Sequence, residues 1–61
     1  MEEKFYALLE DKTVNDEKAI VSFNDYSIDI MDIQDGANGY GHIFFNPIEA
    51  IEYLKVIGAL N

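Results

Sequence analysis

Apolar positions along the chain follow a two-residue repeat in four segments and a helical repeat in the last one. The segments with strand patterns are Lys4–Glu10, Ala19–Asn24, Tyr26–Gln34 and His42–Phe45. They are rich in β-branched and aromatic residues, and polar or turn-forming residues separate them. After Pro47, the residues Ile51, Leu54 and Ile57 share one face of a helix. We therefore expect a single α+β domain over residues 1–61, with a small four-stranded antiparallel sheet (β-β-β-β-α) and one C-terminal amphipathic helix packed on one face.

The N-terminal segment carries apolar residues on both faces of the expected strand. Phe5 and Leu9 share one face, and Tyr6 and Leu8 share the other. The polar residues that follow predict either a loop or a single helical turn starting at Thr13, because an acid three residues after a hydroxyl is a helix start signal.

The segment Tyr26–Gln34 changes phase after Ile30, since Met31 and Ile33 fall on the opposite parity. Either a β-bulge resets the register there, or both faces are covered at that end. The following residues, Asp35–Gly41, contain Asp-Gly and Asn-Gly pairs and predict a loop.

The expected helix has a start signal and a stop signal. Asn46 is a favourable cap, Pro47 suits the first turn, and Glu49 is placed to reach back to the cap. Gly58 is a candidate C-terminal cap near the expected helix end at residues 57–59. The outer half of this helix also carries three small or apolar residues that are not expected to lie in the core of one subunit, namely Ile48, Val56 and Ala59.

One helix cannot cover both faces of a four-stranded sheet, so apolar side chains are expected on the uncovered face. Soluble monomers rarely leave an apolar patch larger than a few hundred Å². A second copy of the chain is the simplest cover, and a monomer that awaits a different partner is the alternative. We expect a homodimer with the interface residues Tyr6, Leu8, Ile48 and Val56.

Charge narrows the choice of partner. Twelve acidic residues stand against four lysines, giving a formal net charge of -8. This balance disfavours direct binding to nucleic acid or to an anionic membrane and favours a basic protein. An acidic surface of this kind either mimics nucleic acid or only keeps the protein soluble. The residues expected to bind a partner are Asp25, Asp29, Asp32, Asp35 and Tyr40.

Catalytic and metal sites find no support in the residue types and their spacing. The chain has no cysteine and one histidine, His42, and the aspartate spacing does not fit a calcium loop. The glycines at 36, 39 and 41 lack the order of a phosphate loop, and Glu49 and Glu52 fall on an exposed helix face. We expect no catalytic residue, cofactor or metal. No apolar stretch has the length of a signal peptide or membrane span, which predicts a cytoplasmic protein.

These observations favour a non-enzymatic protein-binding module, an acidic homodimer that regulates or inhibits a basic host protein. In size and charge, without a shared motif, the chain is similar to the small acidic inhibitors that bacteriophages encode against host defences. The alternative is a small-molecule sequestering protein with its ligand held between subunits. The neutral polar anchors available for such a ligand are Asn38, Tyr40, His42 and Asn46.

Overall fold

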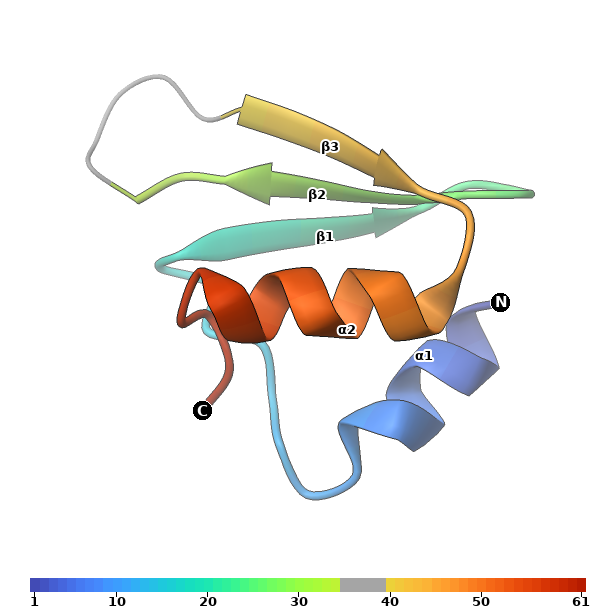
Figure 1. Ribbon diagram of the computed structural model, residues 1–61, viewed down its shortest axis with the longest axis horizontal. Helices are drawn as coiled ribbons and strands as arrows, with labels where there is room; N and C mark the ends of the chain where they lie inside the picture. Colours follow the sequence, from blue (N-terminus) through green and yellow to red (C-terminus); the bar gives the residue numbers. More distant parts are fainter. Residues whose placement is uncertain (35–39) are drawn as a thin grey trace.

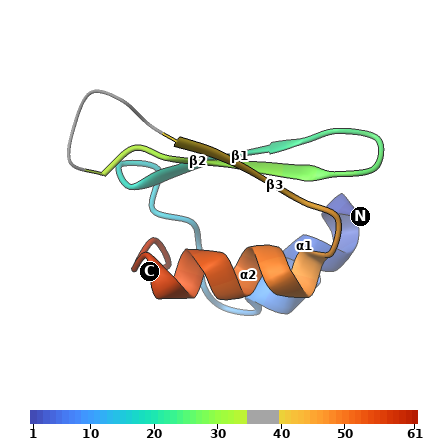
Figure 2. The same ribbon diagram turned by 45° about the horizontal axis from the view of Figure 1, so that its top comes forward.

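The protein is a two-layer α+β domain. The computed structural model describes residues 1–34 and 40–61. Its elements are α1 (Glu2–Leu9), β1 (Ala19–Phe23), β2 (Ile28–Asp32), β3 (Tyr40–Phe44) and α2 (Pro47–Val56). The strands form one antiparallel sheet in the order β1-β2-β3, and both helices lie on the same side of it (Figures 1 and 2). The α+β class and the C-terminal helix are confirmed, whereas the four-stranded sheet with a single helix is wrong.

The N-terminal segment is the helix α1, not the strand predicted for Lys4–Glu10. Its residues are mostly strong helix formers, and Glu2 and Glu3 in the first turn interact favourably with the helix dipole. Phe5 and Leu9 lie on one face of α1 and are buried. A separation of four residues satisfies both the strand repeat and the helical i, i+4 repeat, so this pair does not distinguish the two.

The connection between α1 and β1 contains a short turn, but Thr13 does not cap it. The turn begins at Asn15, whose Oδ1 accepts a hydrogen bond from the amide of Glu17 at 3.0 Å. The carbonyl of Asn15 also accepts from the amide of Ala19 at 3.1 Å. Thr13 instead binds Asn61. The carbonyl of Thr13 accepts a hydrogen bond from the backbone amide of Asn61 at 2.8 Å, and its hydroxyl accepts one from the side-chain amide of Asn61 at 3.2 Å. The helical turn predicted at Thr13 is therefore wrong by two residues.

Both explanations offered for the phase change after Ile30 are wrong. Strand β2 pairs with β1 and β3 without interruption, so no bulge is present. Met31 is 46% exposed, so the face that carries it is not covered, and Ile33 lies beyond the end of the strand. The predicted loop Asp35–Gly41 falls mostly outside the described residues; Gly41 itself belongs to β3 and pairs with Met31.

Helix α2 begins as predicted. The side chain of Asn46 accepts a hydrogen bond from the amide of Ile48 at 2.8 Å, and Pro47 occupies the first turn. This arrangement satisfies one of the amides that a helix start leaves unpaired, and proline has no amide to satisfy.

The end of α2 is a Schellman motif centred on Gly58, which has a φ of 70°. The amide of Gly58 donates to the carbonyl of Lys55 at 3.1 Å, and that of Ala59 donates to Leu54 at 2.9 Å. The predicted glycine cap is confirmed. Because the helix stops at Val56, Ala59 turns back into the core and is fully buried, so its predicted place on the outer half of the helix is wrong.

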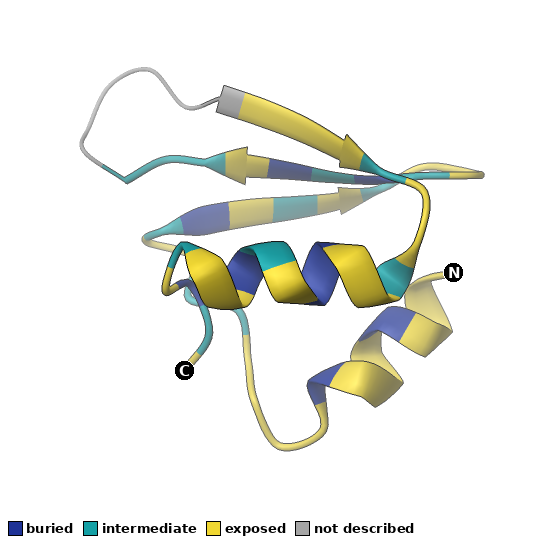
Figure 3. Ribbon diagram, in the orientation of Figure 1, coloured by how far each residue is buried: buried dark blue, intermediate teal, exposed yellow. Residues whose placement is uncertain are grey.

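The core lies between the sheet and the two helices, where the buried positions face one another (Figure 3). Helix α2 packs against β2, β3 and α1. The buried residues are all apolar: Phe5, Leu9, Ala19, Ile28, Ile30, Ala50, Ile51, Leu54 and Ala59. Because both helices cover the same face, the opposite face of the sheet has no covering layer within the described chain.

Candidate partner-binding surface

The uncovered face of the sheet is apolar. Alternate residues of a strand point to opposite faces, and the buried set including Ile28 and Ile30 faces the helices. The outward set contains Ile20, Met31 and Ile43, which are 48%, 46% and 62% exposed. We call this surface the outer face. It holds a hollow of about 330 Å³. The residues that line this hollow from the outward positions are Ile20, Ser22, Asp29, Met31, Gly41 and Ile43.

The sheet therefore has the uncovered apolar face that we expected. The residues on it are not the expected interface residues Tyr6, Leu8, Ile48 and Val56. Of the large apolar residues of β1, Ile20 lies on this face, whereas Phe23 points to the helix side. Met31 and Ile43 were missed because their meeting depends on strand register, since Met31 is opposite Ile20 on β1 and Gly41 on β3. Reading the cross-strand pairs after placing the turns is the signal that would have found them.

Asp29 lies within this apolar surface and has one carboxylate oxygen without a partner. Its Oδ2 accepts from the side-chain amide of Asn24 at 2.7 Å. Its Oδ1 is buried and has no hydrogen-bond partner in the described part of the chain. Leaving a buried acceptor unsatisfied costs about 1–3 kcal/mol, so Asp29 favours a contact in which neighbouring side chains move aside and let a donor reach this oxygen.

The other acidic residues predicted to bind a partner do not join Asp29 in one cluster. Asp25 is exposed in the turn between β1 and β2. Asp32 ends β2 in register with buried Ala19, which places it among the helix-facing positions, and its Oδ1 accepts from the amide of Gln34 at 3.1 Å. Asp35 lies outside the described residues. Tyr40 begins β3 opposite Asp32.

On the helix side, β3 and α2 meet through an aromatic cluster. The ring of Tyr53 lies 4.7 Å from that of His42 and 5.2 Å from that of Phe44, between centroids. Burial and, secondarily, the negative charge of Asp32 raise the pKa of Tyr53 above its ordinary value. His42 thus packs against α2, and Asn46 caps that helix, so two of the four anchors considered for a small ligand have structural contacts.

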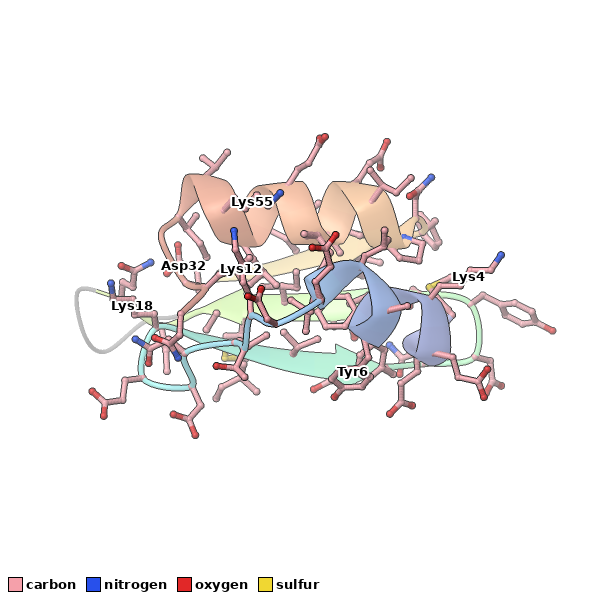
Figure 4. All side chains as sticks on the ribbon, turned by 90° about the horizontal axis from the view of Figure 1, so that it is seen from below. Lys4, Tyr6, Lys12, Lys18, Asp32 and Lys55 are labelled. Carbon is pink, nitrogen blue, oxygen red and sulfur yellow. The ribbon has the colours of Figure 1, made fainter. Side chains whose placement is uncertain are left out.

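The residues predicted for the oligomer interface are all exposed, but they lie in three separate places. Tyr6 contacts the ring of Phe23 at 5.6 Å and sits on the β1 side of α1 (Figure 4). Leu8 and Ile48 line one hollow between α1 and the start of α2. Val56, 84% exposed, is at the far end of α2.

Charge is distributed differently on the two sides of the molecule. Lys12 and Lys55 line one small hollow on the helix side and lie close together in Figure 4. The hollow of the outer face is lined by one acid, Asp29, and by no lysine. With twelve acidic residues and four lysines in the chain, internal ion pairs cannot neutralise the excess negative charge.

No group of three histidine, aspartate or glutamate side chains in the described ranges is arranged to hold a metal ion. Of the helices that the structure describes, none has the length and apolar character needed to cross a bilayer. Comparisons of the chain with protein-family models, with curated proteins and with solved structures gave no match.

Proposed function

We propose that this protein is a non-enzymatic binding module, an acidic homodimer that docks on a basic protein through its outer face and thereby regulates or inhibits it. The observation that carries the proposal is Asp29, a carboxylate with an unsatisfied oxygen in an apolar hollow that neither helix covers. An apolar surface with one acceptor suits a side chain that has an apolar stem and a cationic head.

Lysine and arginine have this construction, because their methylene stems cover apolar surface while the charged group stays polar. In the proposed complex the stem of such a residue packs on Ile20, Met31 and Ile43, and its head donates to Asp29. A hydrogen bond between charged groups is shorter and about twice as strong as a neutral one. The outer face therefore favours a cationic side chain over an apolar one of the same length.

The remaining carboxylates act at longer range. Most of those in the described ranges are exposed, for example Glu2 and Glu3 on α1 and Asp25 at the β1–β2 turn. Charges of this kind raise the rate of encounter with a basic partner, and salt screens them. The partner's own ligand is excluded when the acidic module occupies the basic surface, which is the proposed mode of inhibition.

The test is capture of partners from a lysate of the native host by immobilised protein, with elution by increasing salt. Wild-type protein is compared with Asp29→Asn, which keeps the shape and the contact to Asn24 while it removes one charge. Glu52→Gln is the matched control, because it removes the same charge from an exposed position on α2. We expect a basic protein that the wild type and Glu52→Gln retain to similar salt concentrations, and that Asp29→Asn loses at lower salt.

Two results would overturn the proposal. Equal loss of binding in both variants would show that only the net charge matters and that the outer face has no specific role. Captured proteins without any basic member, eluting independently of salt, would exclude the electrostatic part of the mechanism.

A further inference from the structure

The free edge of β3 exposes backbone groups that the sheet does not pair. Strand order places β3 at an edge, with β2 as its neighbour. The amide of Ile33 donates to the carbonyl of Lys18 at 3.0 Å, so the odd-numbered residues of β2 bond to β1 and the even-numbered ones to β3. His42 is in register with Ile30 and therefore bonds to β2. The peptide groups of its neighbours Gly41 and Ile43 accordingly point away from the sheet.

This edge lacks the features that normally prevent strands from pairing between molecules. Edge strands are usually protected by charged residues, proline or bulges. None of these occurs in β3, and the surrounding stretch from Gly36 to Ile48 contains no charged residue when His42 is neutral. Ile43 is 62% exposed and Phe45 is 72% exposed, which adds apolar surface along the same edge.

The free edge of β1 differs in charge. Antiparallel pairing of two β1 strands about Val21 would set Glu17 of one chain opposite Asp25 of the other, and like charges directly opposite one another are destabilising. The same pairing of two β3 strands about Ile43 sets Gly41 opposite Phe45, with no charge on either side. In a chain with a net charge of -8, β3 is thus the sheet edge at which two copies approach with least repulsion.

We infer that β3 pairs antiparallel with β3 of a second copy, about a two-fold axis at Ile43, to form a continuous six-stranded sheet. The inference rests on the homodimer in the proposed function and adds the surface that forms it. A two-fold interface is self-complementary, as a strand edge pairing with its own copy must be. The pairing places two outer faces side by side, so that one dimer offers two Asp29 hollows on a single surface.

Light scattering on three variants, each of which adds one acidic residue, tests this arrangement. Ile43→Asp places two like charges next to the axis and is expected to reduce the mass from that of two chains to the 6.9 kDa of one. Val56→Asp alters an equally apolar exposed position on α2, and Ile20→Asp alters the outer face at the opposite edge strand. Both are expected to remain dimeric.

Dissociation by Val56→Asp but not by Ile43→Asp would place the interface on the helices and overturn the inference. Dissociation by Ile20→Asp as well as Ile43→Asp would instead indicate packing of two outer faces against each other. A wild-type protein that is a monomer at all concentrations would also overturn it, whereas binding to a basic protein would still be decided by the Asp29→Asn comparison.

Hydrogen exchange gives a second measurement that needs no variant and so does not depend on Ile43→Asp remaining folded. In the proposed dimer the outward amide of Ile43 is hydrogen bonded, and its protection is expected to rise with protein concentration. The outward amide of Val21, on the free edge of β1, is the internal control and should show no such rise. Equal behaviour of the two amides at all concentrations would contradict the pairing.

Discussion

The two helices of this protein are specified in different ways. Helix α2 begins at an asparagine cap followed by proline, has Lys55 in its last turn, and ends at a glycine with positive φ. Helix α1 has Met1 at its N-cap without a side-chain hydrogen bond, has no basic residue in its last turn, and is followed by Glu10 at a φ of 59°. Both helices are too short to be stable in isolation, but local signals mark the two ends of α2, whereas α1 lacks them and depends more on packing.

That packing is concentrated in two side chains, of which Phe5 is the larger. Its ring makes edge contacts with Phe23 of β1 at 5.3 Å and with Tyr6 at 5.5 Å, between centroids. Leu9 is the other buried residue of α1. Tertiary contacts of this kind are not encoded in the helix itself, which explains why no cap marks α1 in the sequence.

The largest expected effect comes from Phe5→Ala. Truncating a fully buried phenylalanine typically costs about 3–5 kcal/mol, and for a 61-residue domain this is a large part of the free energy of unfolding. Urea unfolding followed by circular dichroism measures the loss. Tyr6→Ala, at a position that is 55% exposed on the same helix, is the control and should cost much less. Equal losses in the two variants would mean that the burial of Phe5 is not what holds α1.

A smaller loss is expected from Gly58→Ala at the end of α2. A φ of 70° is unfavourable for residues with a Cβ, by about 1–2 kcal/mol. An added Cβ meets no atom within 4 Å, so the cost is conformational and not steric crowding. Thermal unfolding of Gly58→Ala and Gly41→Ala provides the comparison, because Gly41 has equal space without a positive φ. No difference between the two would argue against the Schellman end of α2.

The corresponding change at the end of α1 is expected to act in the opposite direction. Glu10 has φ 59° and ψ -116°, and the amide of Lys12 donates to the carbonyl of Leu9 at 3.0 Å. These are the features of a type II′ turn, which favours glycine at its second position. Glu10→Gly should therefore stabilise the protein, by less than about 1 kcal/mol because glycine also adds freedom to the unfolded chain. Destabilisation in the same thermal assay would contradict this description of the turn.

The smallest effect is confined to alkaline pH and concerns the contact of α2 with the sheet. Because burial and Asp32 raise the pKa of Tyr53, the folded protein keeps this proton at a pH where the unfolded chain begins to lose it. The resulting contribution to the free energy of unfolding is present below about pH 10, and it is lost as pH rises through the higher pKa of the folded state. Urea unfolding from pH 8 upward should show a shallower alkaline loss for Tyr53→Phe than for wild type; parallel curves would exclude the contribution.

Much of the fold follows from local patterns in the sequence. The caps at Asn46 and Gly58 fix α2, and β-branched and aromatic residues mark β1, which is where it was expected. The strand prediction for α1 failed because Phe5 and Leu9 are compatible with either repeat. Its helix-forming residues and the two glutamates at its start favour a helix, whereas its apolar alternation favours a strand, and the packing of Phe5 and Leu9 in the core decides for the helix.

The candidate site was less predictable, for a physical reason. Asp29 could be placed on a strand face from its parity, but its unsatisfied oxygen depends on where Asn24 places its amide across the turn. The apolar neighbours Ile20, Met31 and Ile43 come from three strands, and only the pairing register brings them together. Properties that arise between strands are not visible in any single segment of the chain.

The last residues of the chain also have a consequence for how the molecule forms. Leu60 bridges to Val14, and Asn61 bonds to Thr13, a partner 48 positions away along the polypeptide. Contacts of such long sequence separation close the largest loops and slow the search for the native state. The segment that leads out of α1 is thus held partly by the residues that follow α2, so these two segments are expected to acquire and lose their ordered state in one cooperative step.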